Sequence, residues 1–546
     1  MKKKYVRWTL WTIASPFILF IILCILIYLP PIQNFLVDKA AVYASEATGM
    51  NISVGRISLS FPLNLVVTNV DAASPHNDTL LSVRRLQVNV QLLPLLKKQV
   101  EVDGISLQGA TVNSNDLIHG MKLNGTLGEL FISSHGVALD PETAIVNKVL
   151  LKDTDLSLCL NDTAAADTAA SDTTYWKIIL QDIDLQNVSF ALDMPLDSLS
   201  LAASLDNAIL RDGLIDLHKS AYSLQTFRIE NGRVRYDNGK PLAADSLSSG
   251  LDPSHIALTD IGVKLDSLYY GGRNMKAIIS QFVLKERSGV EIVSATGRMV
   301  SNDKVLRVPS LKLETRDSYL ELNAAMDWNA LDFKDEGLVS ARLMADIGKP
   351  DVVRFMGSMD EKFIRQYPSE PLRIRTGIDG DLNKLKLTTL TAELPGALGL
   401  FARGELTHLT DSLLRGGDIT LEAETKDLKF VSTLAEGIEI PYGTRLEGKF
   451  TMAGTKMGTD LLLMQPEAQA VVAADTIPIT VYNDSISVAD DFKMERAARL
   501  FAKYDLSRDR YEADLAVNHF DLHQFMPADS LYTLSTRLKV EGEGFD

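Results

Sequence analysis

The stretch that comes nearest to a known binding motif is GTRLEGKF, Gly443 to Phe450. It fits G-x-x-x-x-G-K, the phosphate-binding loop of many nucleotide-binding proteins. In that loop a Ser or Thr follows the lysine, holds magnesium and begins a helix. Here Phe450 follows the lysine, and the residues on both sides alternate as strands do. The stretch therefore does not predict a nucleotide site, and no cofactor is expected.

The histidines and cysteines offer no clearer chemistry. His519 and His523 are spaced i, i+4, which could hold zinc on a helix, but the H-E-x-x-H glutamate is absent and the surroundings predict strand. Cys24 lies in an apolar run and Cys159 in a predicted strand far from it, so neither a disulfide nor a cysteine metal site is predicted. The acidic residues are spread evenly along the chain. The sequence thus predicts no catalytic, cofactor-binding or metal residues, and no enzyme.

The net charge excludes one class of partner. The chain of 546 residues carries a formal charge of −16, with 46% hydrophobic and 23% charged residues. Nucleic-acid binding would require a basic stripe, which this balance does not favour. The composition is that of a globular protein, and nucleic acid is not expected as a partner.

The N-terminus predicts a membrane anchor. Residues 9–29, TLWTIASPFILFIILCILIYL, contain no charge, and roughly 20 apolar residues span a bilayer as a helix. Lys2, Lys3, Lys4 and Arg7 precede the run, so residues 1–8 should be a cytoplasmic tail and the remainder should be exported. The run is longer than the apolar region of a signal peptide and no A-x-A cleavage site follows closely.

Beyond the anchor, one short helix gives way to strands. Residues 31–49 place Ile32, Phe35, Leu36 and Tyr43 on one helical face, which predicts an amphipathic helix that either caps the next domain or lies on the outer leaflet. From Asn51 onward apolar residues recur at every second position, as in half-buried strands.

We assign residues 50–350 to a β-region with a disordered loop at 161–174, whose apolar content is alanine alone. One hairpin is clear at 311–328, with its turn at Arg316, Asp317 and Ser318. Residues 351–367 predict a helix that Asp351 caps. Strands return over 368–546, where the chain ends as if interrupted; 494–507 could be helix or strand.

These elements predict a mainly β protein: a transmembrane helix followed by a long, curved antiparallel sheet that forms an elongated groove, with few short helices. The strand phrases recur without a fixed period, which argues against a uniform solenoid. If each strand with its turn takes about 12 residues, the chain beyond the anchor holds about 40 strands, and so long a sheet must curl.

Three stretches carry a resemblance to a known family: ATGMNISVGRISLSFPLNLVVTNV, LLSVRRLQVNVQLLPLLKKQVEVDGISLQGATV and FRIENGRVRYDNG. In their order after an anchor they resemble the AsmA-like superfamily, and within it the TamB (translocation and assembly module) proteins of Gram-negative envelopes. The opening 120 residues carry most of the likeness. Members of that type are longer and end in a domain that meets an outer-membrane barrel, so this chain resembles an N-terminal portion.

The resemblance implies a β-groove whose apolar inner surface carries phospholipid acyl chains between the inner and outer membranes. The protein would be a single-pass inner-membrane protein with its bulk in the periplasm. An outer-membrane β-barrel protein is a possible partner through a C-terminal region absent here. From the alternation of apolar and polar residues along the strands, the candidate lipid-facing residues are Leu86, Val88, Val90, Leu92, Phe227, Ile229, Val234, Tyr236, Leu320 and Leu322.

Two other functions fit the same sequence. A scaffold or tether could help outer-membrane proteins assemble by offering a strand edge to its clients. An exported enzyme or glycan binder would need a polar cleft, for which no residues can be named. An ordinary sandwich core would also produce the same alternation, and only the arrangement of the strands distinguishes these alternatives.

Overall fold

The structure is a computed structural model. It describes residues 39, 41–42, 45, 49–60, 64–74, 78–90, 102–114, 121–138, 142–161, 175–239, 250–334, 337–356, 361–434, 437–466, 494–527 and 532–544. The predicted anchor at 9–29, most of the helix at 31–49 and the loop at 162–174 lie outside this part of the chain, as does Leu92.

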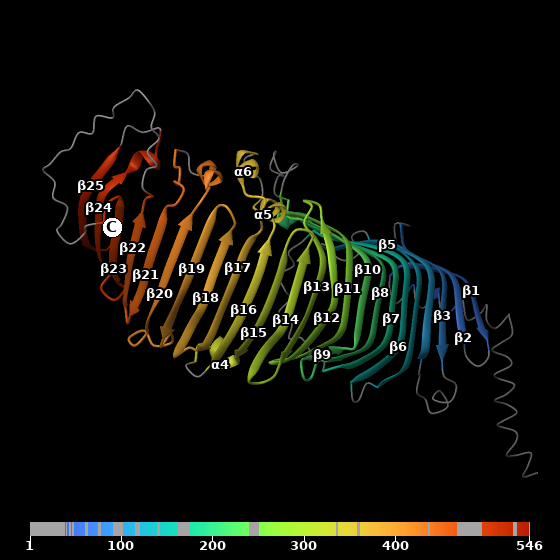
Figure 1. The fold of residues 1–546 in the computed structure, drawn as a ribbon. Helices are drawn as coiled ribbons and strands as arrows, with labels where there is room; N and C mark the ends of the chain where they lie inside the picture. The colour runs from blue at the N-terminus through green and yellow to red at the C-terminus, as the bar shows by residue number, and fades with distance from the viewer. Residues whose placement is uncertain are drawn as a thin grey trace, which may run out of the picture. The chain divides into compact units, whose positions relative to one another are not determined.

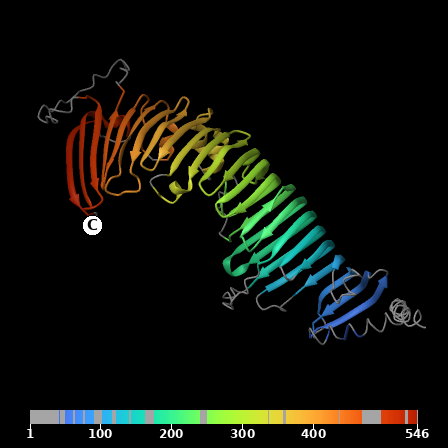
Figure 2. The same ribbon diagram turned by 90° about the horizontal axis from the view of Figure 1, so that it is seen from below.

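The described residues are mainly β, as predicted, and their 25 strands belong to one sheet. Figure 1 shows successive strands lying side by side, and Figure 2 shows the same order from a second direction. Contacts divide the chain into two units: residues 1–242, 253–272 and 284–287 form the first, and residues 243–252, 273–283 and 288–546 form the second.

The strands of the first unit precede β12 in the chain. They are β1 (Asn51–Ser60), β2 (Asn64–Ala73), β3 (Thr79–Val90), β4 (Val102–Asn113), β5 (Met121–Ala138), β6 (Thr143–Leu160), β7 (Lys177–Met194), β8 (Leu199–Asp216), β9 (Ala221–Leu224), β10 (Thr226–Asp237) and β11 (His255–Gly271). The strand β12 (Asn274–Glu286) contributes to both units.

The remaining strands belong to the second unit. They are β13 (Glu291–Ser301), β14 (Val305–Thr315), β15 (Tyr319–Asp327), β16 (Leu338–Ile347), β17 (Leu372–Asp381), β18 (Lys384–Leu394), β19 (Leu398–Thr407), β20 (Gly416–Thr425), β21 (Arg445–Ala453), β22 (Lys456–Met464), β23 (Ala497–Asp505), β24 (Arg510–Asp521) and β25 (Thr533–Glu543). The ambiguous stretch at 494–507 is therefore mostly strand.

The helices of the described residues are short. They are η1 (Pro195–Asp197), α4 (Trp328–Leu331), α5 (Lys349–Phe355), α6 (Glu361–Gln366), η2 (Lys429–Thr433) and η3 (Leu522–Gln524). Within the second unit, α5 and α6 lie at one end of the strands and α4 at the other (Figure 1). Among the residues that the structure describes, no helix is both long and apolar enough to cross a membrane.

The hairpin predicted at 311–328 is confirmed. Leu313 lies opposite Leu320 and Leu311 opposite Leu322, so the alternating residues of β14 and β15 share one face. The chain leaves the strand one residue earlier than predicted, because Trp328 begins α4.

The described residues form 25 strands, fewer than the prediction of about 40 for the chain beyond the anchor, which assumed about 12 residues for a strand and its turn. The strands β5, β6, β7 and β8 each contain 18 residues. Longer strands use more residues between successive turns, so the same length of chain forms fewer strands.

The sheet also departs from the purely antiparallel arrangement that we expected. The strands β6 and β7 are parallel, with Thr143 opposite Lys177 and Cys159 opposite Asp193. Parallel neighbours need a connection of about a dozen or more residues, and the chain from Asn161 to Trp176 supplies one.

The helix predicted at 351–367 is two helices, α5 and α6. The N-cap of α5 is Gly348, so the prediction that Asp351 caps the helix was wrong. Asp351 instead lies in the first turn and is 1% exposed. The helix begins earlier because Pro350, at an N-terminal position, has no N–H to leave unpaired.

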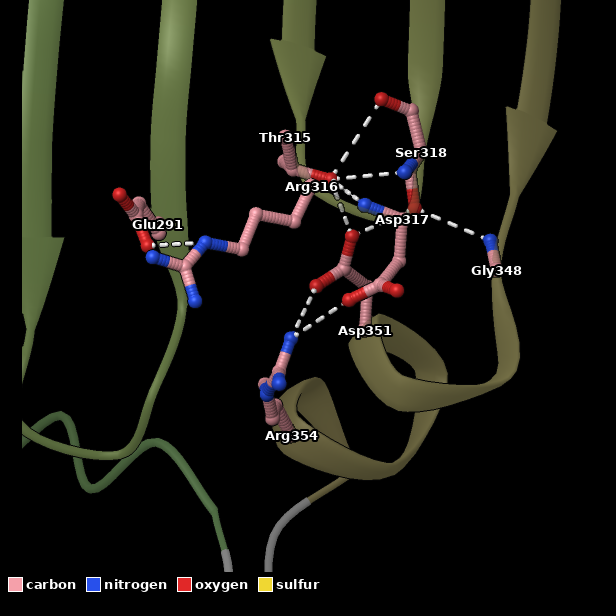
Figure 3. A network of polar contacts seen from close by, with 8 residues as sticks. All are labelled: Glu291, Thr315, Arg316, Asp317, Ser318, Gly348, Asp351 and Arg354. Atoms are coloured by element: carbon pink, nitrogen blue, oxygen red, sulfur yellow. Dashed lines mark hydrogen bonds and ion pairs between the residues drawn. The ribbon is translucent and has the colours of Figure 1, made fainter.

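The buried Asp351 carboxylate fastens α5 to the turn between β14 and β15 (Figure 3). Its Oδ2 accepts hydrogen bonds from the hydroxyls of Thr315 and of Ser318, the latter at 2.6 Å, and its Oδ1 lies 3.0 Å from the Arg354 guanidinium. The Ser318 hydroxyl in turn accepts from the Gly348 N–H at 3.0 Å.

The approach of the two segments also requires glycine at this point. A Cβ at position 348 would lie 2.3 Å from the carbonyl oxygen of Asp317. The same Asp317 places its carboxylate 3.0 Å from Arg354, so the guanidinium that pairs with Asp351 within the helix also joins α5 to the turn.

We predict that Asp351→Asn loosens α5. An amide cannot replace the charge opposite Arg354: if its oxygen accepts from the two hydroxyls, its NH2 group faces the guanidinium, so local opening should become easier by about 2 kcal/mol. Hydrogen exchange of the full chain should show faster exchange over residues 349–355. The control is Glu361→Gln, since the Glu361–Arg365 pair is exposed on both sides and should contribute nothing measurable. Equal exchange in the wild type and in Asp351→Asn would contradict this role.

Candidate functional site

The predicted lipid-facing residues Leu86 and Val88 of β3 lie among apolar partners on both sides. Leu86 is opposite Val67 of β2 and Leu107 of β4. Val88 has equivalent partners, Leu65 and Ile105. Between Leu86 and Val88, the Gln87 side chain donates to Asn89 at 3.0 Å. Alternation thus separates an apolar face from a polar one over these three strands.

The register extends these pairs into two apolar rows across the first unit. One row runs through Leu86 and the other through Val88. The Leu86 row contains Val67, Leu86, Leu107, Leu130, Leu151, Leu185, Ala208, Ile229 and Val263. The Val88 row contains Leu65, Val88, Ile105, Ile132, Val149, Ile183, Leu210, Phe227 and Leu265. Four candidates from distant parts of the sequence therefore lie in two neighbouring rows.

A line of mostly polar residues, which we call the polar row, borders the Leu86 row. Its members lie at matching positions of successive strands: Gly55, Asn69, Arg84, Gly109, Gly128, Asp153, Asn187, Asp206 and Asn231. The Asn187 side chain donates to Asp153 at 2.9 Å, and Asn231 donates to Asp206. Side-chain hydrogen bonds thus join β6 to β7 and β8 to β10 along the polar row.

The backbone departs from a regular pleat along the polar row. Asn69, Asp153, Asn187 and Asn231 all have φ near +50°, as does Gly109 at 62°. Asn and Asp are the residues other than glycine that tolerate this conformation best. The positive φ is the local cause of a change in the alternation, as in a β-bulge.

The candidates Val234 and Tyr236 lie beyond the polar row. In a strictly alternating strand, Ile229 and Val234 would point to opposite faces. The positive φ of Asn231 lies between them. Val234 belongs to a further apolar set with Ala203 and Phe190, and Tyr236 lies opposite Leu201.

In the second unit the candidates Leu320 and Leu322 lie in two more rows. The Leu322 row continues through Leu343, Thr376, Leu390, Ala402, Leu421, Gly448, Leu461, Leu500, Leu515 and Leu538. The Leu320 row continues through Ala345, Ile374, Ala392, Leu400, Ala423, Leu446, Leu463, Ala498, Val517 and Thr536. We call the face that carries these rows the apolar face of the second unit.

The opposite face of the second unit carries ion pairs between neighbouring strands. Asp460 lies 2.6 Å from Arg499, and Asp514 lies 2.7 Å from Arg537. Hydrogen bonds from these guanidinium groups lower the pKa of both carboxyls below the ordinary value. Further cross-strand pairs on this face are Asp346–Arg375, Lys384–Glu405, Asp418–Lys449 and Glu424–Arg445.

Among the described residues, two small buried cores lie at opposite ends of the apolar face. At the α4 end, Ala330 packs with Val339 and Leu382. The second core lies at the end that carries α6. Phe363 and Tyr367 of the α6 segment pack with Phe430 of η2, Leu394 and Ala397. Among the described strands, the extensive contacts are between neighbours in the ladder. Most residues of the Leu320 and Leu322 rows are consequently half-buried rather than enclosed.

The stretches that resemble nucleotide-binding and zinc-binding motifs fall on strands and turns. Gly443 lies in a turn before β21, and Lys449 within that strand lies 3.8 Å from Asp418. His519 is in β24, where its ring contacts the Asn518 side chain at 2.8 Å, and His523 stacks on Tyr532. Among the residues that the structure describes, no group of three or more His, Cys, Asp or Glu could hold a metal ion.

The sequence pattern identified the candidate lipid-facing residues. It did not identify the polar row or most members of the Leu86, Val88, Leu320 and Leu322 rows. The polar row has a signal in the sequence: two residues rather than one separate neighbouring apolar positions, as between Leu86 and Val83. Rows across many strands leave no such signal, because each strand's partners depend on turn lengths and bulges. Of the remaining candidates, only the backbone of Val90 is described, opposite Val102.

We predict that the ion pairs on the polar face stabilise the second unit in a pH-dependent way. A carboxyl with a lowered pKa in the folded state contributes stability above its unfolded pKa of about 3.9, and this is lost as the pH falls through the folded value. The double variant Asp460→Asn with Asp514→Asn should therefore have a lower urea-unfolding midpoint than the wild type at pH 7, and the difference should shrink at pH 3. Glu424→Gln is the control, because its partner lies 3.8 Å away and both side chains are more than half exposed. A difference that does not change with pH would contradict the prediction.

No protein-family model matches the chain, and a search of curated proteins finds no match to it either.

Proposed function

We propose that this protein conducts phospholipids between the inner and outer membranes, with their acyl chains lying on the apolar side of its sheet. The observation that carries the proposal is the continuity of the apolar rows. From β14 to β25 the Leu322 row is interrupted only by Thr376 and Gly448. Such a path offers a hydrocarbon chain similar contacts at each successive strand.

The free energy of hydration favours an occupant for this surface. Leaving apolar surface in water costs about 25 cal/mol per Å². In a sandwich a second sheet would remove the surface from water, but the described strands belong to one sheet and most residues of the Leu320 and Leu322 rows are only half-buried. Hydrocarbon chains would satisfy the surface without forming a second protein layer.

The location follows from the N-terminal sequence and from the resemblance to AsmA-like proteins. We propose a transmembrane helix at 9–29, a cytoplasmic N-terminus and a periplasmic sheet. An outer-membrane partner belongs to the same proposal, as a component that receives the lipid.

A reporter fusion tests the orientation. Alkaline phosphatase fused after Gly49 should be active, because the enzyme folds only outside the cytoplasm, and a fluorescent protein that folds only in the cytoplasm should be dark at the same position. Fusions after Lys4 serve as the control, with the opposite outcome expected. A fluorescent, phosphatase-negative fusion after Gly49 would contradict the orientation.

A charge on the apolar side tests transport. Val88→Asp should leave folding intact, since an open surface can hydrate locally, but should block lipid passage because burying an unpaired charge among acyl chains is costly. The matched control is Gln87→Asp, one residue away on the polar side. Transfer of labelled phospholipid and outer-membrane integrity should fall in the first variant and remain normal in the second.

The outcomes separate the alternatives. A folded Val88→Asp protein that transfers lipid normally would refute the conduit. If that variant failed to transfer lipid but still supported assembly of outer-membrane proteins, the scaffold role would be separate from transport. Unfolding of Val88→Asp, with Gln87→Asp intact, would indicate an enclosed core instead of an open surface. In that case Val234→Asp, on the other side of the polar row, repeats the test.

A further inference from the structure

The apolar face of the second unit contains a hollow that the candidate residues do not include. It has a volume of about 610 Å³ and lies over β19 to β24. Its lining residues on this face are apolar or aromatic in all but one case: Leu406, Gly417, Ile419, Phe450, Met452, Met457, Thr459, Ala502, Tyr504, Tyr511 and Ala513.

The register explains why these side chains converge. One row runs from Met452 through Met457 to Tyr504 and Tyr511. The adjacent row on the same face runs from Ile419 through Phe450, Thr459 and Ala502 to Ala513. Residues two apart in a strand point the same way, so both rows line the hollow.

Small residues leave the hollow open, and large side chains form its walls. Gly417 has no side chain opposite Met452, and Ala502 lies opposite Ala513. Phe450 and Met457 are 42% and 43% exposed, which is high for such side chains within a sheet. Methionine adapts its shape to an apolar occupant more readily than branched side chains do.

The backbone beneath the hollow has no hydrogen bonds to offer. The ladders from β20 to β24 run without a register shift, so their N–H and C=O groups are paired within the sheet. A peptide laid in the hollow would leave its own backbone groups unpaired, whereas a hydrocarbon chain has none. The volume also lies within the range of about 300–1,000 Å³ that is usual for small-molecule sites.

The charges argue for an esterified chain over a free fatty acid. Lys503 alternates with Ala502 and Tyr504 and so points to the opposite face, where its amine lies 4.7 Å from the Phe501 ring. Among the described lining residues, no lysine or arginine side chain faces the hollow by register. A free carboxylate would therefore lack a partner, while the ester-linked chain of a phospholipid is uncharged.

We propose that this hollow is a discrete binding station for one acyl chain of a phospholipid. The inference rests on the proposed function but goes beyond it, because a uniform apolar path would hold lipid equally at every strand. The station predicts a preferred position at Phe450, Met457 and Tyr504.

The test fills the hollow without making it polar. The full-length protein, reconstituted in phosphatidylcholine vesicles, is irradiated with a phosphatidylethanolamine that carries a diazirine in one acyl chain, and labelled peptides are mapped by mass spectrometry. Wild-type protein should be labelled at the residues of the hollow. Ala502→Leu and Ala513→Leu, singly and together, should lower that labelling by about tenfold in the double variant, because the added methyl and methylene groups occupy the space of the chain. Thr451→Leu, on the opposite face, should leave the labelling unchanged.

Each outcome decides a separate point. Undiminished labelling of the hollow in either folded single variant, and in the double variant where it folds, would overturn the station. Loss of label in the hollow, with label along the remaining apolar face unchanged, would support it. Label spread evenly along the face of the wild type would overturn the station but leave the proposed function standing, and no label anywhere would overturn both. Palmitate carrying the same diazirine, if it labelled the hollow as well as the phospholipid does, would overturn the assignment to an esterified chain.

Discussion

The cross-strand register is the constraint on which the rest of this structure depends. A strand has a side-chain period of two, so a slip of one residue would move all of its apolar side chains to the other face. The Leu322 row keeps its phase from β14 to β25 through every antiparallel pair. Pairing with its neighbour determines which residues of each strand face the apolar side. The apolar face is therefore a property of the whole ladder rather than of any one strand.

In both units some neighbouring apolar residues of a strand are three positions apart instead of two, and the two units accommodate this longer step differently. In β14 the chain advances three positions from Val308 to Leu311, and in β18 from Leu387 to Leu390, while the partner strand advances by only two, which is a bulge. In the first unit both partners carry the longer step, and the polar row marks it with positive φ values. A bulge corrects the side-chain alternation of one strand, whereas the polar row marks a change in the alternation of several neighbouring strands at one line.

The sequence allowed the strands to be predicted much better than their partners. Alternation identified Leu86, Val88, Leu320 and Leu322 because the side-chain period is local. It could not show that Leu86 and Ile229 share a row, since that depends on the lengths of the intervening turns and on the parallel pairing of β6 with β7. The role of Asp351 was also beyond local rules: its partners Thr315 and Ser318 are distant in the sequence, and a cap was the nearest local explanation for an acid at the start of a helix.

The charge distribution decides which side of the sheet can take an apolar partner. On the polar face, Asp460 and Asp514 are engaged by arginines, and covering these pairs would require removing charges from water at a cost that burial alone does not repay. The apolar face has no such cost, and its backbone is already satisfied by the ladder. An occupant that brings apolar surface and no unpaired hydrogen-bonding groups gains most there. This is the physical reason to prefer hydrocarbon over peptide as its partner, and to expect the hollow between Phe450 and Tyr504 to hold it best.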